Sequence, residues 1–486
     1  MKTPEPCIVV IFGASGDLTQ RKLFPALHNL QVEGLVPRHT AIVGTSRTAY
    51  SDDEFRTRMR SAVEEHSRIP PTDESWAALA EDVFYVPGDV TDGDLWARLK
   101  TKLEAIDESC GTRGNRVWYL ATMPDFFGGI AEQIGKSGLL DTGGWHQLVV
   151  EKPFGLDLDS ARDLNANIGR FFAEDQVFRI DHYLGKETVQ NLLVFRFSNA
   201  IFEPIWNRRY VDNVQITVAE DIGIEERAAF YERVGALRDV GQNHLSQLLA
   251  LVAMEPPVSW DADAIRDEKV QVLKAVKRLT TDECADCVVR GQYNGYRATD
   301  GVADTSSTET FFAARFAIDN WRWAGVPFYV RTGKALARKA TEISIQFQDV
   351  PHLLFSKTAV KRLEPNVLTI RIQPNEGISL WFGTKIPGPD IEVTTVDMEF
   401  DYASDFGSGT PEAYERLLLD CMIDDRMLFT RADEIEEAWA IVEPILEHWR
   451  GGGRPGFYPP GSWGPAAADE LLGREGRRWR DPQRND

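Results

Sequence analysis

One short segment, FRIDHYLGKETVQN at residues 178–191, gathers four kinds of reactive side chain. It places a carboxylate, an imidazole, a phenol and an ammonium group within six positions, on Asp181, His182, Tyr183 and Lys186. Several donors beside a point charge can hold a phosphate group, and His182 and Lys186 share a face if a helix begins here. A carboxylate repels phosphate, so we expect Asp181 to orient a base. The segment predicts a phosphorylated substrate next to acid–base chemistry, with a polar loop between helices as the alternative.

A second polar segment, RDVGQNHLSQLL, contains a candidate base. His244 is one of only eight histidines, and it lies in the polar opening of an otherwise apolar helix expected over residues 235–254. An imidazole there suits proton abstraction near neutral pH. Five positions turn through ~140° on an ideal α-helix, so Asp239 and His244 would contact different substrate atoms. Asp181 then remains available to orient His244, while a hydrogen-bonded structural histidine is the alternative.

A glycine-rich turn follows the first apolar run of the chain. Residues 7–12, CIVVIF, predict a strand buried on both faces, and a helical pattern follows at residues 21–34. The turn between them offers backbone N–H groups and a positive helix end to a pyrophosphate. Its spacing is GxxG rather than GxGxxG, so a purely structural turn is the alternative. The turn consists of Gly13, Ala14, Ser15, Gly16, Asp17 and Leu18.

The end of the next strand favours NADP over NAD as the bound dinucleotide. NAD-binding units tend to place an Asp or Glu there for the ribose 2′-hydroxyl. Here strand 40–45 ends in Thr45, Ser46 and Arg47, and a guanidinium beside hydroxyl groups suits a 2′-phosphate. NAD stays the weaker alternative. The later strands that could receive the adenine carry Asp89, Val90 and Tyr119.

The motif EKPFG follows the apolar strand HQLVV. Lys152 in this motif projects from the carboxyl end of a strand, where ligands bind in open α/β sheets. It could contact both substrate oxygens and the nicotinamide, with an ion pair to Glu151 as the alternative. Pro153 restricts the backbone and admits a cis peptide bond.

The pattern of elements predicts two domains. Strands alternate with helices up to residue 178, which indicates an α/β, Rossmann-like, doubly wound parallel sheet. Many alternating strands without intervening helices follow residue 287, which indicates a large, mainly antiparallel sheet. We therefore expect a dinucleotide-binding domain at 1–178 and an α+β substrate-binding domain at 179–486.

Composition excludes several classes of partner. The formal net charge of −21 argues against nucleic acids and anionic membrane surfaces. No apolar run approaches the ~20 residues of a membrane span, and the N-terminus lacks a signal-peptide layout, so we expect a cytoplasmic protein. The five cysteines include a lone CxxC pair, Cys284 and Cys287, for which we predict no metal or redox role.

Together these segments resemble glucose-6-phosphate dehydrogenases. The resemblance runs from about residue 8 to about residue 465 and rests on IVVIFGASGDLTQRKLFPAL, EKPFG, FRIDHYLGKE, IFEPIWNRRY, RDVGQNHL, IRDEKVQVLKAV, GVPFYVRTGKAL and RIQPNEG. RIDHYLGKE and EKPFG are its most specific parts. The resemblance implies oxidation of glucose 6-phosphate at C1 to the lactone with hydride transfer to NADP, the first step of the oxidative pentose phosphate pathway. It also implies a homodimer or homotetramer that assembles through the antiparallel sheet.

The resemblance gives each candidate residue a role. His244 would be the general base, and Asp181 would orient it. Residues 182–186 would hold the 6-phosphate, while the glycine turn and Arg47 would hold NADP. The remaining sugar contacts would fall on Lys152, which also reaches the cofactor, and on Glu220, Asp239, Lys334 and Gln373.

Some points depart from the family pattern. Gln20 stands where the family more often has a lysine, and the sequence around Glu220 differs from common versions. Whether Arg338 or Lys339 reaches the substrate stays open, as does an additional structural NADP site. Two other functions also remain: an oxidoreductase for an unphosphorylated aldose, and a non-catalytic nucleotide-binding regulator.

Overall fold

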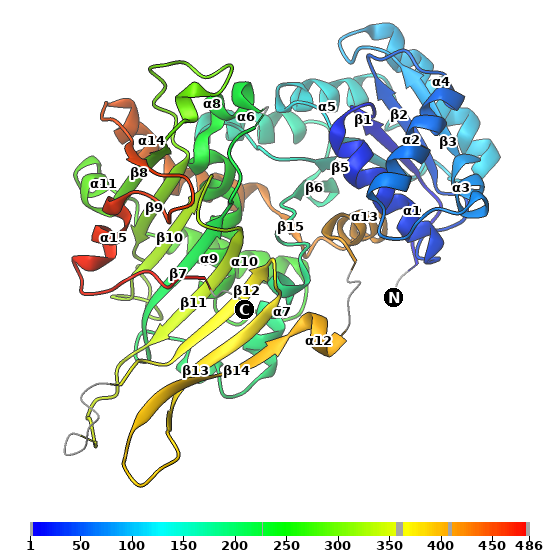
Figure 1. The fold of residues 1–486 in the computed structure, drawn as a ribbon. Helices are drawn as coiled ribbons and strands as arrows, with labels where there is room; N and C mark the ends of the chain where they lie inside the picture. Colours follow the sequence, from blue (N-terminus) through cyan, green and yellow to red (C-terminus); the bar gives the residue numbers. More distant parts are fainter. Residues whose placement is uncertain (1–2, 226, 356–362, 407–410, 483–486) are drawn as a thin grey trace. The chain divides into compact units, whose positions relative to one another are not determined.

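The computed structural model describes residues 3–225, 227–355, 363–406 and 411–482, and Figure 1 shows their course. The chain forms two compact units. The first unit comprises residues 1–186, 259–266 and 409–436, and the second comprises residues 187–258, 267–408 and 437–486. Each unit therefore draws on three separate stretches of chain, and the division at residue 178 stays a prediction.

Within the described residues, the first unit contains a seven-stranded sheet in the order β15-β6-β5-β4-β1-β2-β3. All neighbouring strands are parallel except β15, which is antiparallel to β6. The predicted doubly wound parallel sheet is confirmed. The strands are β1 (Ile8–Phe12), β2 (Ala41–Ser46), β3 (Val83–Pro87), β4 (Arg116–Leu120), β5 (His146–Val150), β6 (Val177–Ile180) and β15 (Phe429–Thr430).

Several helices of the first unit begin or end at ordinary capping residues. Ser51, Thr72 and Asp157 each accept a hydrogen bond from the third helical N–H, which fixes where α2, α3 and α6 start. Gly111 ends α4 in the left-handed conformation. The helices are η1 (Thr19–Leu23, a π-helix), α1 (Phe24–Val32), α2 (Asp52–His66), α3 (Asp73–Ala80), α4 (Gly93–Cys110), α5 (Phe127–Lys136), α6 (Leu158–Ile168) and α13 (Ala413–Ile423).

The part of the second unit that the structure describes contains a nine-stranded sheet in the order β14-β13-β12-β11-β7-β10-β9-β8-β16. Its neighbours are antiparallel except for two parallel pairs, β7 with β10 and β8 with β16. The predicted large, mainly antiparallel sheet is confirmed. The strands are β7 (Val211–Ala219), β8 (Val288–Tyr293), β9 (Phe311–Phe316), β10 (Phe328–Gly333), β11 (Ala340–Phe347), β12 (Val367–Gln373), β13 (Gly377–Lys385), β14 (Val393–Asp401) and β16 (Gly456–Tyr458).

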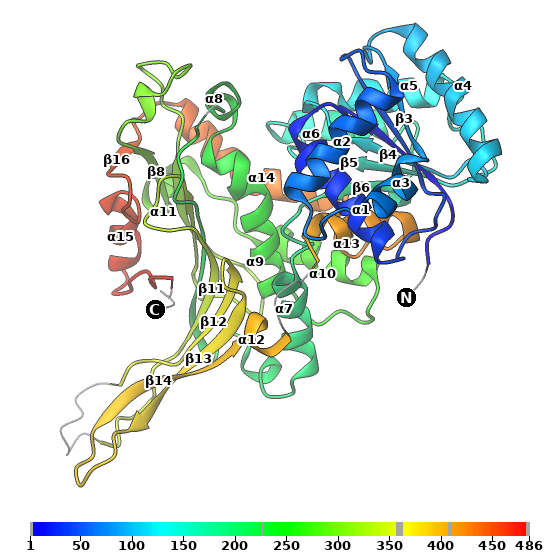
Figure 2. The ribbon, with the colours of Figure 1, turned by 45° about the vertical axis from the view of Figure 1, so that its right-hand side comes forward.

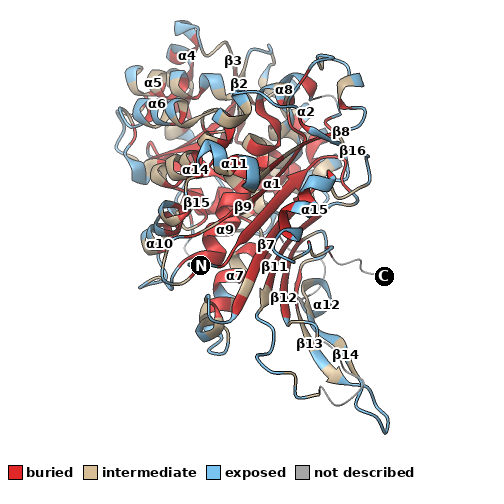
Figure 3. Ribbon diagram, turned by 90° about the vertical axis from the view of Figure 1, so that its left-hand side faces the viewer, coloured by how far each residue is buried: buried red, intermediate tan, exposed pale blue. Residues whose placement is uncertain are grey.

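Helices cover this sheet unevenly. Figure 2 shows α7 and α9 along one face and α15 on the other. The central strands are buried, β13 is buried only in its first residues, and the edge strand β14 is largely exposed (Figure 3). The helices are α7 (Glu187–Ser198), α8 (Ala228–Ala236), η5 (Leu237–Leu245, a π-helix), α9 (Ser246–Ala253), α10 (Ala262–Ala275), α11 (Thr281–Cys287), α12 (Tyr402–Phe406), α14 (Ala432–Arg450) and α15 (Ala466–Gly473), of which α10 and α14 contribute residues to both units.

The prediction of a single α-helix over residues 235–254 is wrong in detail. Gly235 interrupts it with φ 69° and ψ 175°, and a π-helix runs from Leu237 to Leu245 before α9 begins. A π-helix bonds residue i to residue i+5, so Asp239 and His244 are neighbours along its axis. The ~140° separation expected for an ideal α-helix therefore does not apply.

In the described residues, no helix has both the length and the apolar character needed to cross a membrane.

Candidate active site

The glycine turn lies at the carboxyl end of β1, directly before the helical segment that leads into α1. The N–H groups of Gly13 and Ala14 both donate to the carbonyl oxygen of Thr45, at 2.9 and 3.1 Å. Gly13 has φ 86°, and a Cβ there would lie 2.2 Å from the carbonyl oxygen of Ala121. Only glycine fits this close approach. The turn is thus packed between two strand ends, with Gly16 and Asp17 exposed to solvent.

The structure brings the glycine turn together with the end of β2. The Ser46 hydroxyl donates to the Ser15 hydroxyl at 2.9 Å, and the Thr48 hydroxyl lies 3.3 Å from Ser15. Arg47 between them is exposed. Asp89, after the end of β3, interacts electrostatically with Arg47. The pKa of Asp89 lies below its usual value, first because the Thr91 N–H and hydroxyl donate to it and then because of Arg47.

These groups fit a dinucleotide. A helix start behind a glycine turn offers N–H donors to a pyrophosphate, and Arg47 with three hydroxyl groups offers donors to a second phosphate. Val90 beside Asp89 is half-buried, as is Leu18 at the end of the turn. The predicted cofactor residues of the turn and of the β2 and β3 ends therefore lie along one edge of the sheet.

Tyr119 and Lys152 are placed by a buried carboxylate. The Tyr119 side chain is fully enclosed in β4, and its hydroxyl donates to Glu151 at 2.6 Å. Burial raises the pKa of Glu151, although the hydroxyl groups of Tyr119 and Tyr414 donate to it. Lys152 follows Glu151 at the end of β5, is half-buried, and precedes Pro153 through the cis peptide bond considered for this position.

The predicted phosphate-binding residues, 182–186, form a turn rather than the first turn of a helix. Residues 182–186 are not helical, and α7 begins only at Glu187, so the expected helical face is wrong. The buried Asp181 carboxylate accepts the N–H of Tyr183 at 3.0 Å. The Lys186 ammonium lies 5.3 Å from the centre of the Tyr183 ring, and the His182 ring lies 5.1 Å from it. The turn thus gathers the ammonium, the phenol and the imidazole.

One residue of this cluster had no signal in the sequence. Tyr414 of α13 stacks on His182, with ring centres 6.5 Å apart and planes at 11°, and also donates to Glu151. The buried Glu415 accepts hydrogen bonds from Arg68 at 2.8 Å and Asn29 at 2.9 Å, which anchors α13. These contacts join residues more than 200 positions apart, so no local pattern could reveal them.

In the second unit, sheet register places two of the predicted sugar-binding residues side by side. Strands β7 and β10 are parallel, with Ala219 opposite Gly333. The next residues, Glu220 and Lys334, therefore leave the same edge of the sheet, and the Lys334 ammonium donates to the Glu220 carboxylate. Lys334 is buried to 3% exposure, and its ammonium also lies 3.8 Å from the Asp239 carboxylate.

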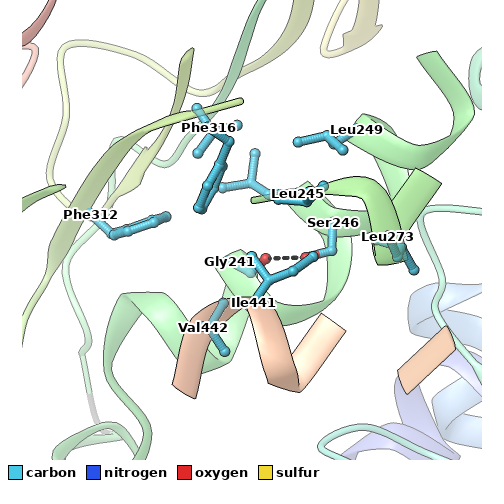
Figure 4. A pocket seen from close by; sticks show the side chains of 11 residues that line it. Gly241, Leu245, Ser246, Leu249, Leu273, Phe312, Phe316, Ile441 and Val442 are labelled. Carbon is cyan, nitrogen blue, oxygen red and sulfur yellow. Dashed lines mark hydrogen bonds between the residues drawn. The ribbon is translucent and has the colours of Figure 1, made fainter. Parts of the chain in front are cut away.

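His244 lies on the π-helix that carries Asp239. Its imidazole is 2% exposed, and its backbone N–H donates to the Asn243 side chain at 2.6 Å. The apolar side of the same helix packs against β9 and α14, leaving a void of about 10 Å³ (Figure 4). Figure 4 also shows the Ser246 hydroxyl donating to the Gly241 carbonyl at 2.9 Å. The back of the helix is thus fixed in a mainly apolar core, and its polar side carries Asp239 and His244.

Gln373 lies at the end of β12, opposite Thr341 of β11, which in turn pairs with Val218 of β7. Its side chain donates to the Thr341 hydroxyl at 2.9 Å. A polar groove of about 280 Å³ is lined by Gln373 together with both Arg338 and Lys339. Since both cations line the groove, the choice between them stays open.

Comparison with known proteins finds one family over the length of the chain. Residues 10–191 match the model of the glucose-6-phosphate dehydrogenase NAD-binding domain, and residues 193–480 match that of the glucose-6-phosphate dehydrogenase C-terminal domain. Glucose-6-phosphate 1-dehydrogenase 2 of Mycobacterium tuberculosis is 48% identical over 489 residues, covering 98% of this chain and 95% of that protein.

Solved structures agree with this family assignment. Glucose-6-phosphate 1-dehydrogenase of Mycobacterium avium superposes with a TM-score of 0.85 at 39% identity, covering 99% of this chain and 100% of that one. A glucose-6-phosphate dehydrogenase in complex with its substrate glucose-6-phosphate gives a TM-score of 0.90 at 36% identity, with the same coverage.

Proposed function

The chain belongs to the glucose-6-phosphate dehydrogenase family, and we propose that it oxidises D-glucose 6-phosphate at C1 to 6-phospho-D-glucono-1,5-lactone with hydride transfer to NADP⁺. The observation that carries this proposal is the group formed by the buried Lys334 and the half-buried Glu220 and Asp239, with Asp239 on the helix of His244. This group supplies hydrogen-bonding partners for sugar hydroxyls next to a candidate base. The two carboxylates compensate the charge of Lys334, which permits its burial.

His244 acts as the general base. The hydroxyl proton on O1 must leave as the hydride leaves C1, and an imidazole near neutral pH can accept it. NADP⁺, when bound, supplies the hydride acceptor. Asp181 orients the imidazole and stabilises it once it is protonated. This assignment requires both units to act on one substrate molecule.

The 6-phosphate is bound by His182, Tyr183 and Lys186. An ammonium and an imidazole supply charge, and the phenol supplies a further donor. The stacking of Tyr414 on His182 and the position of Lys186 over Tyr183 support this role, because they fix the orientation of these donors. Lys152 contacts the sugar and the nicotinamide, while Gln373 closes the sugar site.

NADP is the preferred cofactor, with NAD as the weaker alternative. Arg47 at the end of β2, beside the linked hydroxyls of Ser15 and Ser46, supports binding of a 2′-phosphate. Asp89 and Val90, at the end of β3, are proposed for the adenine side, whereas the Tyr119 side chain is fully enclosed in β4 and its hydroxyl is bound to Glu151. The absence of a carboxylate at the end of β2 removes the group that would favour an unphosphorylated ribose.

Initial rates of reduced-nicotinamide formation test the proposal. Glucose 6-phosphate and glucose are compared as substrates, each with NADP⁺ and with NAD⁺. We expect the highest kcat/KM for glucose 6-phosphate with NADP⁺. Equal kcat/KM for glucose would remove the phosphate role and favour the aldose oxidoreductase. A folded protein that forms no reduced cofactor would favour the non-catalytic regulator.

We also propose a cytoplasmic homodimer or homotetramer. All five cysteines lie in described stretches and form no disulfide, which suits a reducing compartment. The exposed edge strand β14 carries Met398 at 58% exposure, which supports burial of this edge against a second copy. Light scattering of the purified protein gives its mass in solution; a monomer at all concentrations would reject the assembly.

A further inference from the structure

Glu309 lies just before β9 and contacts the start of the π-helix that carries the proposed base. Its side chain is 3% exposed. Its carboxylate oxygen Oε1 accepts the N–H of Leu237 at 3.1 Å, and its backbone carbonyl accepts the N–H of Ala236 at 3.0 Å. One buried residue therefore binds two successive amides where the π-helix begins. The first N–H groups of a helix have no hydrogen-bond acceptor within the helix, and these two amides are among them.

The backbone at Gly235 is adapted to this carboxylate. Gly235 has φ 69°, and a Cβ at this position would lie 2.3 Å from Oε1 of Glu309. A side chain at residue 235 would therefore displace Glu309 or the helix start. The glycine permits both the left-handed backbone and the close approach.

The pKa of Glu309 lies above its usual value, because burial outweighs the groups that favour the charged form. Those groups are its own backbone N–H, the Leu237 N–H and the guanidinium groups of Arg290 and Arg238. A carboxylate at a helix N-terminus also interacts favourably with the partial positive charge there. The hydrogen bond from the Leu237 N–H to Oε1 is therefore the contact that holds the helix start.

The next residue supports the other half of the sugar-binding group. The carbonyl oxygen of Thr310 accepts the N–H of Lys334 at 2.9 Å, and the Tyr458 hydroxyl donates to the Lys334 carbonyl at 2.7 Å. Glu309 and Thr310 therefore hold the two elements that carry Asp239 and Lys334. The separation of these two side chains, 3.8 Å, depends on this shared support.

We infer that Glu309 is a positioning residue that fixes the start of the π-helix, and through it the position of the His244 imidazole relative to the sugar. The inference rests on the proposed function of His244 as the base. Glu309 is not placed in contact with substrate or cofactor, so it acts only through the helix. Its effect should therefore appear in the chemical step more than in cofactor binding.

Glu309→Ala and Glu309→Gln test the inference. Glu309→Ala should lower kcat by about 100-fold, the loss expected when a reacting group moves by about 1 Å. The amide oxygen of Glu309→Gln can still accept the Leu237 N–H, so it should recover kcat to within about fivefold of wild type. The KM for NADP⁺ should stay unchanged in both. A kcat for Glu309→Ala near that of wild type, or a Glu309→Gln variant as impaired as Glu309→Ala, would overturn the inference.

Two readouts separate positioning from loss of folded protein. Substrate deuterated at C1 should show a larger isotope effect on kcat in Glu309→Ala, because a misplaced base makes the chemical step limiting; a partly unfolded sample would keep the wild-type isotope effect. Hydrogen exchange at Ala236 and Leu237 should accelerate in Glu309→Ala but not in Glu309→Gln. Unaltered exchange in Glu309→Ala would reject the inference whether or not the enzyme oxidises glucose 6-phosphate.

The matched control is Glu475→Ala. Glu475 accepts the Tyr329 hydroxyl at 2.8 Å in the same unit, and within the described part of the chain it forms no hydrogen bond or ion pair with the π-helix. The Glu475→Ala substitution should lower the thermal stability of the protein while leaving kcat and the isotope effect unchanged. If Glu309→Ala does not fold, Glu309→Asp replaces it, because the shorter side chain keeps the carboxyl group but moves it away from the Leu237 N–H. A folded Glu309→Asp variant with wild-type kcat would equally reject the inference. The proposed function is tested separately by His244→Asn. It is supported if the wild type oxidises glucose 6-phosphate and the His244→Asn variant does not.

Discussion

The two units hold their candidate functional residues in different ways. In the first unit these residues follow strand ends in short turns, and Arg47 and Asp17 are exposed. In the second unit His244 and Lys334 are buried to 2% and 3% exposure and come from distant parts of the chain. An exposed residue can be replaced without disturbing the core, whereas a buried charge cannot. Substitutions at the exposed residues of the first unit should therefore change binding alone, and those at the buried residues of the second should change chemistry and packing.

His244→Asn should have the largest effect. Loss of the general base should lower kcat by roughly 1,000-fold, while KM for both substrates changes by less than about threefold. Initial rates with saturating glucose 6-phosphate and NADP⁺ measure this. His448→Asn, on α14 of the same unit, is the control and should retain kcat. A nearly unchanged kcat in His244→Asn would require a different base.

Lys186→Ala should act on binding alone. Removal of a charge-assisted hydrogen bond costs about 1.5–3 kcal/mol, which corresponds to a KM for glucose 6-phosphate raised by about 10- to 100-fold. The kcat and the thermal stability should stay close to wild type. Lys136→Ala, which removes an exposed cation paired with Glu132 on α5, is the control. If KM for glucose 6-phosphate did not rise, Lys186 would not bind the phosphate.

Arg47→Ala should reduce the preference for NADP⁺ over NAD⁺ by about tenfold, since the guanidinium would no longer meet the 2′-phosphate. The kcat/KM values for the two cofactors give this ratio directly. Arg58→Ala, an exposed arginine of α2, should leave the ratio unchanged. A constant ratio in Arg47→Ala would place the 2′-phosphate contact elsewhere.

The sequence predicts the first unit well because its signals are local. The glycine turn, the end of β2 and the EKPFG motif each lie within a few residues of the strand that positions them. Parallel strands bring their carboxyl ends to one edge, so the approach of Arg47 to the turn follows from topology. The contribution of Tyr414 has no local signal there, because α13 returns from the far end of the sequence.

The second unit is less predictable because its contacts are long-range. The pairing of Glu220 with Lys334 depends on the parallel register of β7 and β10, which are separated by more than 100 residues. The π-helix also escapes the sequence pattern, since a period of 3.6 residues was expected through residues 235–254. Glu309 lies in a polar loop and shows its role only through the amides that it accepts.

His146→Gln sharpens the comparison between the two units, because it should change the stability of the first unit and leave the ligand binding of that unit intact. Burial, and then the nearby Arg116, lower the pKa of His146 to about 4. The Trp118 indole N–H lies 3.4 Å from Nδ1, which favours the neutral ring. In the unfolded chain histidine titrates near pH 6.5, so the stability from the neutral ring is complete above pH 6.5 and is lost as the pH falls towards 4. The free energy of unfolding of the wild type, followed by tryptophan fluorescence in urea, should therefore fall more steeply across this window than that of His146→Gln. His352→Gln, at an exposed position, should follow the wild type, and equal slopes in all three proteins would show that His146 titrates normally in the fold.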